Sequence, residues 1–506
     1  MRYKDELRIA GVTALFCCAM LMITAVVPKD TTVAKARKTF KEAPETAADA
    51  EAQAQSEAED AGFTVYTEDS NYDYEDNSYD DSGSDDTSTD TSDSDSSGDT
   101  TYDPSYDDST TDNTEDNGCY LLDEAQLRRN GQIMLELQQR TGCRALLAQK
   151  AFSNFDVYPV LAPYLAGTEA SGLYESRLGR EQLPEKENHV FCAAYRADEF
   201  AELLQYADHI VFNSPGQLAQ FGPAAKAAGK SVGLRVNPEC STQEGHAIYD
   251  PCAPGSRLGT TRAQWDAAVA AHPELPELLD GLHFHTLCEQ DADALAVTLK
   301  AVEATFGDLL PKMKWVNFGG GHHVTRPGYD LATLEQCICQ VHQTYGVQVY
   351  LEPGEAWALN AGYLVTTVLD TLCNGDTSLA ILDTSAACHT PDVIEMPYRP
   401  PLLDAGEPGE KPCTVRLGGP TCLAGDVMGD YSFKAPLAPG QRLVFGDMAI
   451  YTTCKNNTFN GMPLPDIWLL RQDGSLARLA HFGYQDFRCR LGGRREGTLN
   501  TASVQI

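Results

Sequence analysis

Short apolar runs alternate with amphipathic segments between residues 145 and 351, and this alternation leaves few folds open to the chain. Each run has the length and the bounding turns of a buried strand, and five intervals have helical periodicity. Parallel strands need crossover connections, so repeated alternation of strand and helix predicts a parallel sheet. The runs span 145–148, 189–194, 209–213, 231–237, 281–285, 315–318 and 347–351, and the helical segments span 197–206, 215–228, 261–271, 291–306 and 331–345.

The number of strands favours a closed sheet. Seven strands over about 230 residues fit an α/β fold of the (β/α)8 barrel type, in which chemistry takes place at the carboxyl ends of the strands. Polar residues and a glycine stand at those ends, namely Lys150, Asn213, Asn237, His285, Gly319 and Glu352. We therefore expect a barrel over residues 119–375 with its site at that end.

The pattern changes after about residue 363. Short β-like runs at 378–382, 413–418, 441–445 and 466–470 are separated by proline and glycine. This predicts an all-β C-terminal domain over residues 376–492, followed by a loose tail, 493–506.

An uncharged run of 19 residues, 9–27, dominates the N-terminal segment 1–41. As a helix it would be roughly 28 Å long, close to the thickness of the bilayer core. Five basic residues follow the run and three precede it, which favours a membrane anchor with the catalytic part in the cytoplasm. A signal peptide cleaved near Ala34-Lys35-Ala36, with export, is the competing hypothesis.

Residues 42–118 form an acidic, Ser/Thr/Asp-rich segment without any lysine or arginine. It holds 26 of the 73 acidic residues, and without them the net charge of −35 becomes −9. Such a composition predicts a disordered linker, with a cation-binding segment as the alternative. No basic face indicates a nucleic-acid partner. The 16 cysteines lack regular spacing, which indicates reduced thiols and no zinc set.

Lys150 follows the apolar run 145–148 and is flanked by small and apolar residues. A neutral amine at the end of a buried strand can bond covalently to an aldehyde. A lysine that simply reaches solvent is the alternative.

Two later motifs favour the covalent role for the lysine. His283 and His285 lie two residues apart at a strand end, and an imidazole there can stack on a planar ring, although a structural histidine is equally plausible. Three glycines follow the next strand, and their bare backbone NH groups can cradle a phosphate. These are Gly319, Gly320 and Gly321. Adjacent histidines rarely point the same way and no carboxylate has ligand spacing, so no metal site is predicted.

Further polar residues follow the last strand and lie in the β region. Glu352 leaves a dry interior, where a pyridinium nitrogen would be a fitting partner for its carboxylate. Cys422 and Asp426 place a thiol and a carboxylate in a glycine-framed loop, with a buried structural cysteine as the alternative. The phenol of Tyr451 could bind a phosphate.

Six segments together resemble a known family: AQKAFS (148–153), HFHTLCE (283–289), NFGGGHH (317–323), LEPGEA (351–356), GPTCLAGDV (419–427) and AIYTTCKNNTFNG (449–461). They are similar to the pyridoxal phosphate decarboxylases of the ornithine/diaminopimelate superfamily. The segments at 256–259 and 382–400 resemble the carboxynorspermidine and carboxyspermidine branch in particular. The resemblance covers about residues 119–492 in order and leaves residues 1–118 without a counterpart.

The resemblance implies a homodimer whose active sites lie at the subunit interface and hold pyridoxal 5'-phosphate. Lys150 would carry the cofactor, His285 would stack on its ring, and Glu352 would pair with the ring nitrogen. The glycine triplet and Tyr451 would hold the phosphate. Cys422 of the other subunit would manage protonation after carbon dioxide leaves.

The same resemblance, together with charge, suggests the residues that bind a polyamine precursor. Glu355 stands where ornithine-type relatives carry arginine, and a carboxylate suits a cationic tail. Asp392 and His389 in the CHTPD loop, and Asp426, are further candidates, while Arg257 would orient a carboxylate or an acid of the facing subunit. Diaminopimelate or ornithine decarboxylases, an amino-acid racemase and an inactive surface-tethered binding protein remain alternatives.

Overall fold

The computed structural model describes residues 118–243 and 250–492, which belong to one compact unit of the chain. The predicted anchor (1–41), the acidic linker up to residue 117 and the tail (493–506) lie outside the described residues. Within the described ranges, no helix has both the length and the hydropathy required to cross a bilayer.

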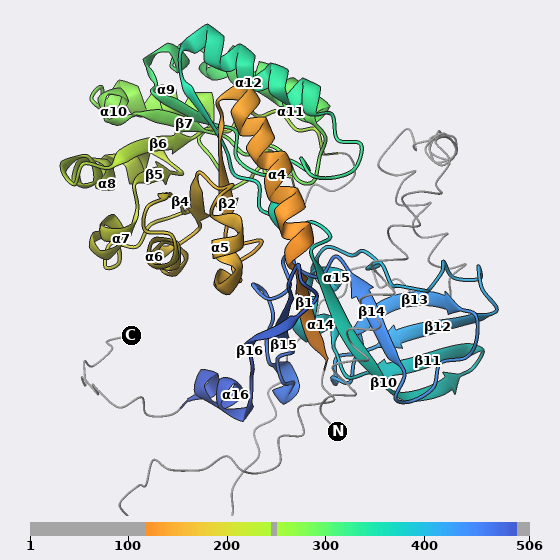
Figure 1. Cartoon of the computed structure of the whole chain (residues 1–506). Helices are drawn as coiled ribbons and strands as arrows, with labels where there is room; N and C mark the ends of the chain where they lie inside the picture. Colours follow the sequence, from red (N-terminus) through yellow and green to blue (C-terminus); the bar gives the residue numbers. More distant parts are fainter. Residues whose placement is uncertain (1–117, 244–249, 493–506) are drawn as a thin grey trace, which may run out of the picture. The chain divides into compact units, whose positions relative to one another are not determined.

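Eight parallel strands close into a barrel in chain order, β2 to β9 (Figure 1). Each strand pairs in register with the next, and β9 pairs with β2 through Arg144↔Tyr350. The strands are β2 (Arg144–Ala148), β3 (Gly167–Ala170), β4 (Glu187–Phe191), β5 (His209–Phe212), β6 (Ser231–Arg235), β7 (Gly281–His283), β8 (Trp315–Asn317) and β9 (Gln348–Leu351).

Seven of these strands overlap the predicted runs, whereas β3 was not predicted. Its sequence Gly-Thr-Glu-Ala is fully buried but contains a threonine and a glutamate, so no apolar run marks it. A strand inside a closed barrel can bury polar side chains when the site needs them, and hydrophobic periodicity cannot detect it.

Helices connect the barrel strands and pack outside them (Figure 1). Helix α4 (Glu124–Thr141) precedes β2, begins at the capping side chain of Asp123 and ends at Gly142, whose φ of 72° suits glycine. The others are α5 (Tyr158–Leu161), α6 (Leu173–Gln182), α7 (Phe200–Tyr206), α8 (Pro215–Ala227), α9 (Arg262–Ala271), α10 (Leu275–Leu278), α11 (Ala292–Phe306), α12 (Leu331–Tyr345) and α13 (Glu355–Ala358), with 3₁₀ turns at Phe155–Val157 and Leu310–Lys312.

The barrel interior is filled by large side chains facing small ones. The indole of Trp315 lies against the backbones of Gly233 and Gly281, where an added Cβ would approach it to 2.4 and 2.1 Å. Leu146, Val211 and Tyr350 complete this buried layer. The layer fills the barrel below its carboxyl end, which leaves that end for a site.

An eight-stranded, mostly antiparallel sheet forms the second part. Its order is β13-β12-β11-β10-β1-β15-β16, and β14 pairs with β10. The strands are β1 (Cys119–Asp123), β10 (Gly362–Asn374), β11 (Thr377–Leu382), β12 (Cys413–Gly418), β13 (Val427–Phe433), β14 (Arg442–Gly446), β15 (Asp466–Leu470) and β16 (Leu476–Ala480), with helices α14 (Ala386–His389), α15 (Asp392–Glu395) and α16 (Tyr484–Leu491) and a 3₁₀ turn at Phe459–Gly461.

The sheet does not begin at residue 376, where the sequence placed the domain boundary. Strand β1, at the start of the range predicted for the barrel, pairs with β10 and β15 in the sheet. Strand β10 lies wholly before residue 376 and pairs with β1, β11 and β14. The sheet is therefore assembled from both sides of the barrel sequence, a pairing that local pattern does not reveal.

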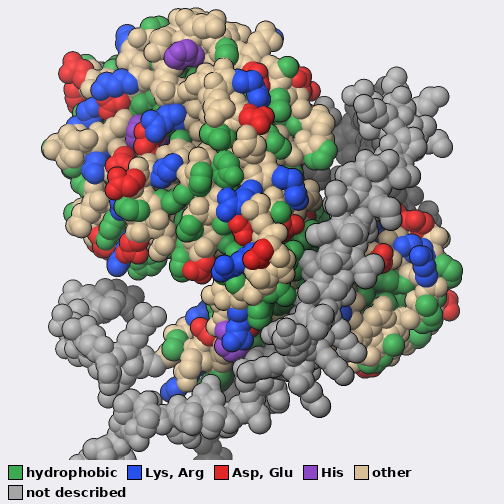
Figure 2. Space-filling model, in the orientation of Figure 1, with side chains coloured by type: hydrophobic (Ala, Val, Ile, Leu, Met, Phe, Trp, Pro, Cys, Tyr) green, Lys and Arg blue, Asp and Glu red, His purple; other side chains and the backbone are tan. Residues whose placement is uncertain are grey.

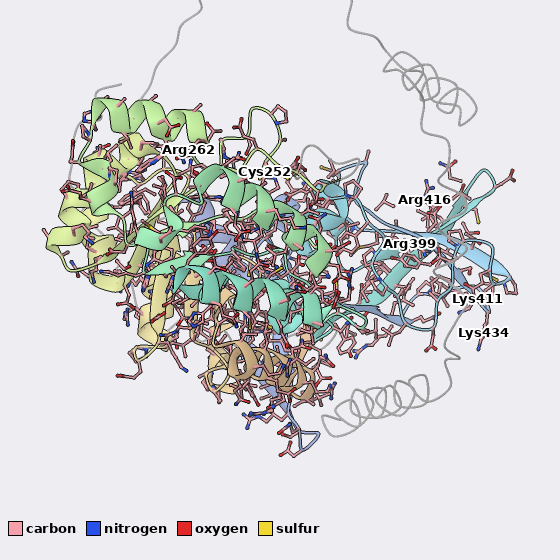
Figure 3. All side chains as sticks on the ribbon, turned by 90° about the horizontal axis from the view of Figure 1, so that it is seen from above. Cys252, Arg262, Arg399, Lys411, Arg416 and Lys434 are labelled. Atoms are coloured by element: carbon pink, nitrogen blue, oxygen red, sulfur yellow. The ribbon has the colours of Figure 1, made fainter. Side chains whose placement is uncertain are left out.

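Charged side chains are interspersed on the described surface. On the face drawn in Figure 2, basic and acidic residues alternate over the barrel. Figure 3 places Arg399, Lys411, Arg416 and Lys434 around the sheet. Arg416 there pairs at 2.7 Å with Asp430, its direct neighbour across β12 and β13, which supports the register of these strands.

Candidate active site

A cavity of about 510 Å³ opens at the carboxyl end of the barrel strands. This volume lies within the range typical of small-molecule sites. Its lining includes eight residues predicted from the sequence, namely Lys150, Arg257, His285, Gly320, Gly321, Glu352, Glu355 and Tyr451. Gly319, the first glycine of the triplet, directly precedes Gly320 in the chain.

Lys150 lies in the turn that directly follows β2. Its neighbours Gln149 and Ala151 are fully buried, whereas the lysine itself is half-buried and lines the cavity. The backbone NH of Tyr451, which follows β14, donates to the carbonyl of Ala151 at 2.9 Å. This bond brings the tyrosine, far away in the sequence, to the same cavity as the lysine.

Glu352 follows β9 and is almost completely buried. The amide of Asn317 donates to Oε1 at 2.6 Å, and Nε2 of His283 lies 2.8 Å from Oε2. Burial alone would raise the pKa of Glu352, but the charge and hydrogen bond of His283 hold it below its usual range. Burial is the largest effect on the pKa of His283 and lowers it, while the charge and hydrogen bond of Glu352 act in the opposite direction.

The glycine turn after β8 packs against the loop after β7. Gly319 and Gly321 have φ of 71° and 79°, and an added Cβ at Gly321 would lie 2.3 Å from the carbonyl oxygen of Leu287. At Gly320 it would lie 2.7 Å from the carbonyl oxygen of Glu352. Only glycine fits this close approach of three loops, and the turn lies beside the cavity.

His285 is held by this turn. The backbone NH of Gly320 lies 3.3 Å from its Nδ1, which therefore accepts the hydrogen bond. Burial, followed by the charges of Lys150 and Arg235, keeps the pKa of His285 well below its usual value. A neutral imidazole of fixed orientation thus faces the cavity.

Tyr451 has a φ of 51°, which is uncommon for a bulky residue and consistent with a functional constraint. Burial raises the pKa of its phenol well above the usual value, so the hydroxyl keeps its proton. The phenol is a hydrogen-bond donor at the cavity wall.

Two buried charged groups at the site were missed by the sequence analysis. Glu169 on β3 is buried, and burial followed by the charge of Glu352 raises its pKa to about 8. Arg235 at the end of β6 lines the cavity, donates to the carbonyl of His285 at 3.3 Å and lies 4.5 Å from the ring of Phe191. The missed strand β3 concealed Glu169, whereas the end of the predicted run 231–237 was a signal that could have indicated Arg235.

Four predicted residues on the sheet side do not line the cavity. Cys422 is exposed, and its backbone NH donates to Oδ1 of Asn460 at 2.8 Å. Asp426 is buried and accepts from the hydroxyls of Ser385 at 2.9 Å and Thr421 at 2.6 Å.

The other two sheet-side residues are also engaged within the chain. His389 is buried, with its ring nitrogens bonded to the backbone of Ser385 and Pro463. Asp392 forms an ion pair with Lys455. None of these four residues lines the cavity, although Asp392 lies near enough to Glu289 and Glu355 for their charges to interact.

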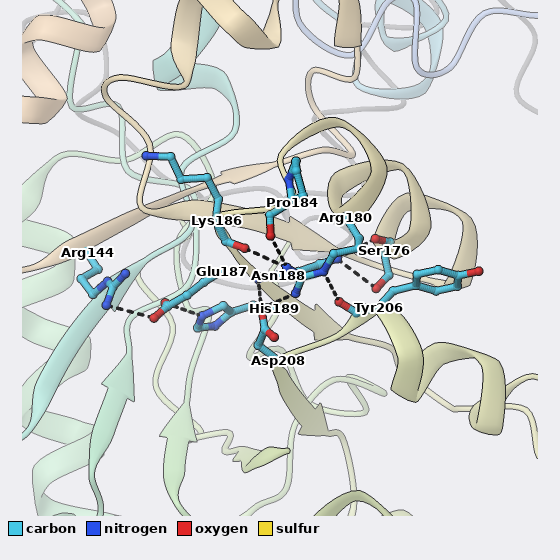
Figure 4. Close-up of polar contacts among 10 residues, drawn as sticks. All are labelled: Arg144, Ser176, Arg180, Pro184, Lys186, Glu187, Asn188, His189, Tyr206 and Asp208. Atoms are coloured by element: carbon cyan, nitrogen blue, oxygen red, sulfur yellow. Dashed lines mark hydrogen bonds and ion pairs between the residues drawn. The ribbon is translucent and has the colours of Figure 1, made fainter. Parts of the chain in front are cut away.

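A second polar cluster lies at the amino ends of β4 and β5, the end of the barrel opposite the cavity. Figure 4 shows its members Arg144, Glu187 and His189. Glu187 bonds to Arg144 at 2.9 Å and to Nε2 of His189 at 3.2 Å, and the rings of His189 and His209 stack with centroids 3.9 Å apart. Burial followed by the charge of His189 lowers the pKa of His209 to about 3. The amino end of a barrel generally serves stability, and we interpret this cluster in that way.

The lining of the cavity fits pyridoxal phosphate. Such a cofactor needs an amine, an ionised carboxylate, a neutral imidazole and a phenol, and the lining provides each of them. It also needs a tight backbone turn for its phosphate, and a Cβ in the glycine turn would collide with the neighbouring loops.

Comparison with known proteins agrees with this assignment. Residues 63–449 match the family described as pyridoxal-dependent decarboxylase, C-terminal sheet domain. A carboxyaminopropylagmatine decarboxylase from Synechocystis sp. is 42% identical over 375 residues, which cover 74% of this chain and 95% of that protein. A carboxynorspermidine/carboxyspermidine decarboxylase from Campylobacter jejuni is 40% identical over 382 residues, covering 73% and 97%.

A solved structure is similar as well. The crystal structure of carboxynorspermidine decarboxylase from Campylobacter jejuni, complexed with norspermidine, superposes with a TM-score of 0.67 at 39% identity. The match covers 74% of this chain and 99% of that one.

Proposed function

The chain belongs to the pyridoxal-dependent decarboxylase family, and from this premise we propose that it removes carbon dioxide from a carboxylated polyamine. The substrate class is that of carboxynorspermidine and carboxyspermidine, and the products are norspermidine and spermidine. One observation carries the proposal: Lys150, the ionised Glu352 and the glycine turn all border one cavity that is also lined by acidic side chains.

Bound pyridoxal phosphate supplies an aldehyde for an amine and a ring that accepts the electrons left when carbon dioxide departs. Lys150 would hold the aldehyde end, and Glu352, kept ionised by His283, would hold a proton on the ring nitrogen. His285 would stack on the ring. The backbone of Gly319, Gly320 and Gly321 and the phenol of Tyr451 would bind the phosphate.

The charges of the cavity support a cationic substrate. Asp250, Glu289 and Glu355 line it, and Glu355 stands in the position after Glu-Pro-Gly where ornithine-type relatives carry arginine. Carboxylates attract the ammonium groups of a polyamine and repel a second acid group. This favours a polyamine precursor over diaminopimelate, which carries two carboxylates.

We further propose that the active unit is a homodimer in which each chain completes the site of the other. Cys422 is exposed, and its neighbours Leu423 and Phe459 expose 44% and 46% of their surfaces. An exposed apolar surface of this kind is suited to contact with a second copy. Cys422 would then hold the proton delivered to the product, and Asp426 would lie near the amine tail of the substrate. Asp392 and His389 would help to bind the amino groups of the substrate, and Arg257 would orient a carboxylate or an acid of the facing subunit.

The decisive experiment is carbon dioxide release by the full-length, cofactor-loaded protein. We expect turnover of carboxynorspermidine or carboxyspermidine and little of diaminopimelate, ornithine or a racemisation substrate. Carboxyaminopropylagmatine belongs in the assay because one relative carries that name. Turnover of diaminopimelate alone would contradict the substrate assignment, and purified protein that binds no cofactor would support the inactive tethered binding protein instead.

A further inference from the structure

Three neighbouring loops at the carboxyl end of the barrel bring two carboxylates and one imidazole together. Glu289 follows β7, His323 follows β8 and Glu355 follows β9. One potential ligand atom from each residue lies within 4.8 Å of those of the other two. Glu289 and Glu355 line the same cavity as Lys150.

The backbone holds Glu289 in this position. The NH of Gln290 donates to the carbonyl of Gly321 at 3.0 Å, and Gln290 forms a parallel bridge with His322. Glu289 itself has a φ of 53°, in the left-handed region that a glutamate rarely adopts. A conformation of this kind persists when the surrounding structure enforces it, and such residues concentrate at functional sites.

The cluster contains two carboxyl groups, those of Glu289 and Glu355, but only one basic side chain, that of His323. Nε2 of His323 lies 2.6 Å from Oε2 of Glu355, and this bond with the charge of Glu355 raises the pKa of His323 despite the opposing effect of burial. Glu289 is accessible through the cavity, yet desolvation and the charge of Glu355 raise its pKa to about 7. The raised pKa of His323 favours a positive charge that offsets Glu355, and a pKa of about 7 leaves Glu289 partly protonated near neutral pH.

Other charged and titratable groups face the cluster from the surrounding elements. Asp392 and Asp447 add negative charge, and Arg326 adds positive charge near His323. Cys288, Tyr398 and Tyr451 keep their protons because burial raises the pKa of each. Near neutral pH, Glu289 is therefore the carboxyl of this group whose charge is most easily changed.

Building on the proposed function, we infer that Glu289, His323 and Glu355 form the subsite for a positively charged nitrogen of the substrate, and that binding expels a proton. The cation takes its place against the carboxylates of Glu289 and Glu355. The carboxylic acid of Glu289 gives its proton to the solvent, so that an ionised carboxylate replaces it beside the bound ammonium or guanidinium group. His323 is a positioning residue that holds Glu355.

The test is calorimetric titration of the full-length, cofactor-loaded protein with norspermidine, a product-type ligand that cannot be decarboxylated. Titrations at one pH near 7 in buffers of different ionisation enthalpy measure the protons released on binding. We expect net release, with affinity that rises by up to about tenfold per pH unit below pH 7 and levels off above it. Agmatine, titrated in parallel, distinguishes a guanidinium from an ammonium preference.

Three variants separate the subsite from a general charge effect. Glu289→Gln removes the titrating carboxyl, and we expect about tenfold weaker binding without proton release or a pH dependence below 7. Glu181→Gln, the same substitution at an exposed position of α6, is the matched control and keeps both. His323→Gln frees Glu355 from its cation, and we expect a lower KM at unchanged bound cofactor absorbance.

Different results would contradict the subsite and the proposed function. Carbon dioxide release from carboxynorspermidine, together with proton release that is equal in wild type and Glu289→Gln, would overturn the subsite alone. An absence of both turnover and polyamine binding would overturn the two together.

Discussion

Nε2 of His283 lies 2.8 Å from Oε2 of Glu352, and both side chains are buried in the barrel. The two residues come from β7 and the end of β9, which are separated by β8 in the barrel. Burial alone would raise the pKa of the carboxylate, but the charge and hydrogen bond of the imidazole hold it below its usual range. The site thereby keeps a buried negative charge available for the cofactor ring.

Removing this donor should cost both stability and activity. His283→Leu leaves the Glu352 carboxylate with one hydrogen-bond donor fewer in a buried position, which we expect to destabilise the fold by about 3 kcal/mol. Urea unfolding and kcat measure the two effects. His272→Leu, at a histidine whose side chain is 58% exposed, is the control and should change neither. A fully active His283→Leu would show that the pairing has no role in the reaction.

Lys150→Ala should abolish turnover together with the visible absorbance of the bound cofactor, because Lys150 is the one lysine among the described residues that line the cavity. An absorbance spectrum of the purified variant checks this directly. Lys300→Ala, on the exposed face of α11, should leave the spectrum unchanged. A wild-type spectrum in Lys150→Ala would refute the assignment of this lysine.

Gly320→Ala should weaken cofactor binding at least tenfold, because its Cβ would lie 2.7 Å from a backbone oxygen that cannot move aside easily. Fluorescence titration of the cofactor-free protein with pyridoxal phosphate measures the change in Kd. Gly172→Ala is the matched control, since nothing lies within 4 Å of a Cβ at that position. Equal affinities in both variants would argue against the glycine turn as the phosphate site.

Cys422→Ala should slow product formation while the cofactor stays bound, with Cys373→Ala, at another exposed cysteine, as the control. If two chains share each site, mixing Cys422→Ala with Lys150→Ala after dissociation and reassociation should restore activity. In a random mixture, up to about a quarter of the sites would be intact, because a mixed dimer places both substitutions in one of its two sites. A mixture no more active than its parts would place Cys422 outside a shared site.

The buried Glu169 should make the stability of the cofactor-free protein depend on pH. Its folded pKa of about 8 exceeds the unfolded value near 4.5, so the native state binds more protons between these values. Stability should therefore fall as pH rises from about 5 to 8. Glu169→Gln should remove part of this loss, raising Tm at pH 8 but not at pH 5. Parallel Tm profiles for the two proteins would show that the carboxyl titrates normally.

Much of the barrel could be predicted because its strands are buried on both sides and their apolar runs stand out locally. Lys150 and Glu352 were identified for the same reason, since each follows an apolar strand at its carboxyl end. Strand β3 escaped because its buried residues include Thr168 and Glu169. Burial of a polar residue is a property of its neighbours in space, so no local pattern could indicate it.

The sheet was less predictable because its pairing is not local. Strand β1 lies between β10 and β15, whose residues are more than 200 positions away. The candidates Asp392, His389, Asp426 and Cys422 were chosen from their motifs, but in one chain they lie outside the cavity. The roles proposed for Cys422 and Asp426 require that a second copy completes the site.

The sequence by itself determined the chemistry available to this protein, because residue types and their order along each strand are local properties. It specified an amine, a carboxylate and a glycine turn at three strand ends. Only the tertiary structure decided which groups meet and how they are charged. Closure of the barrel placed Glu289, His323 and Glu355 side by side, and their shared burial, which depends on every neighbour at once, set the protons they hold.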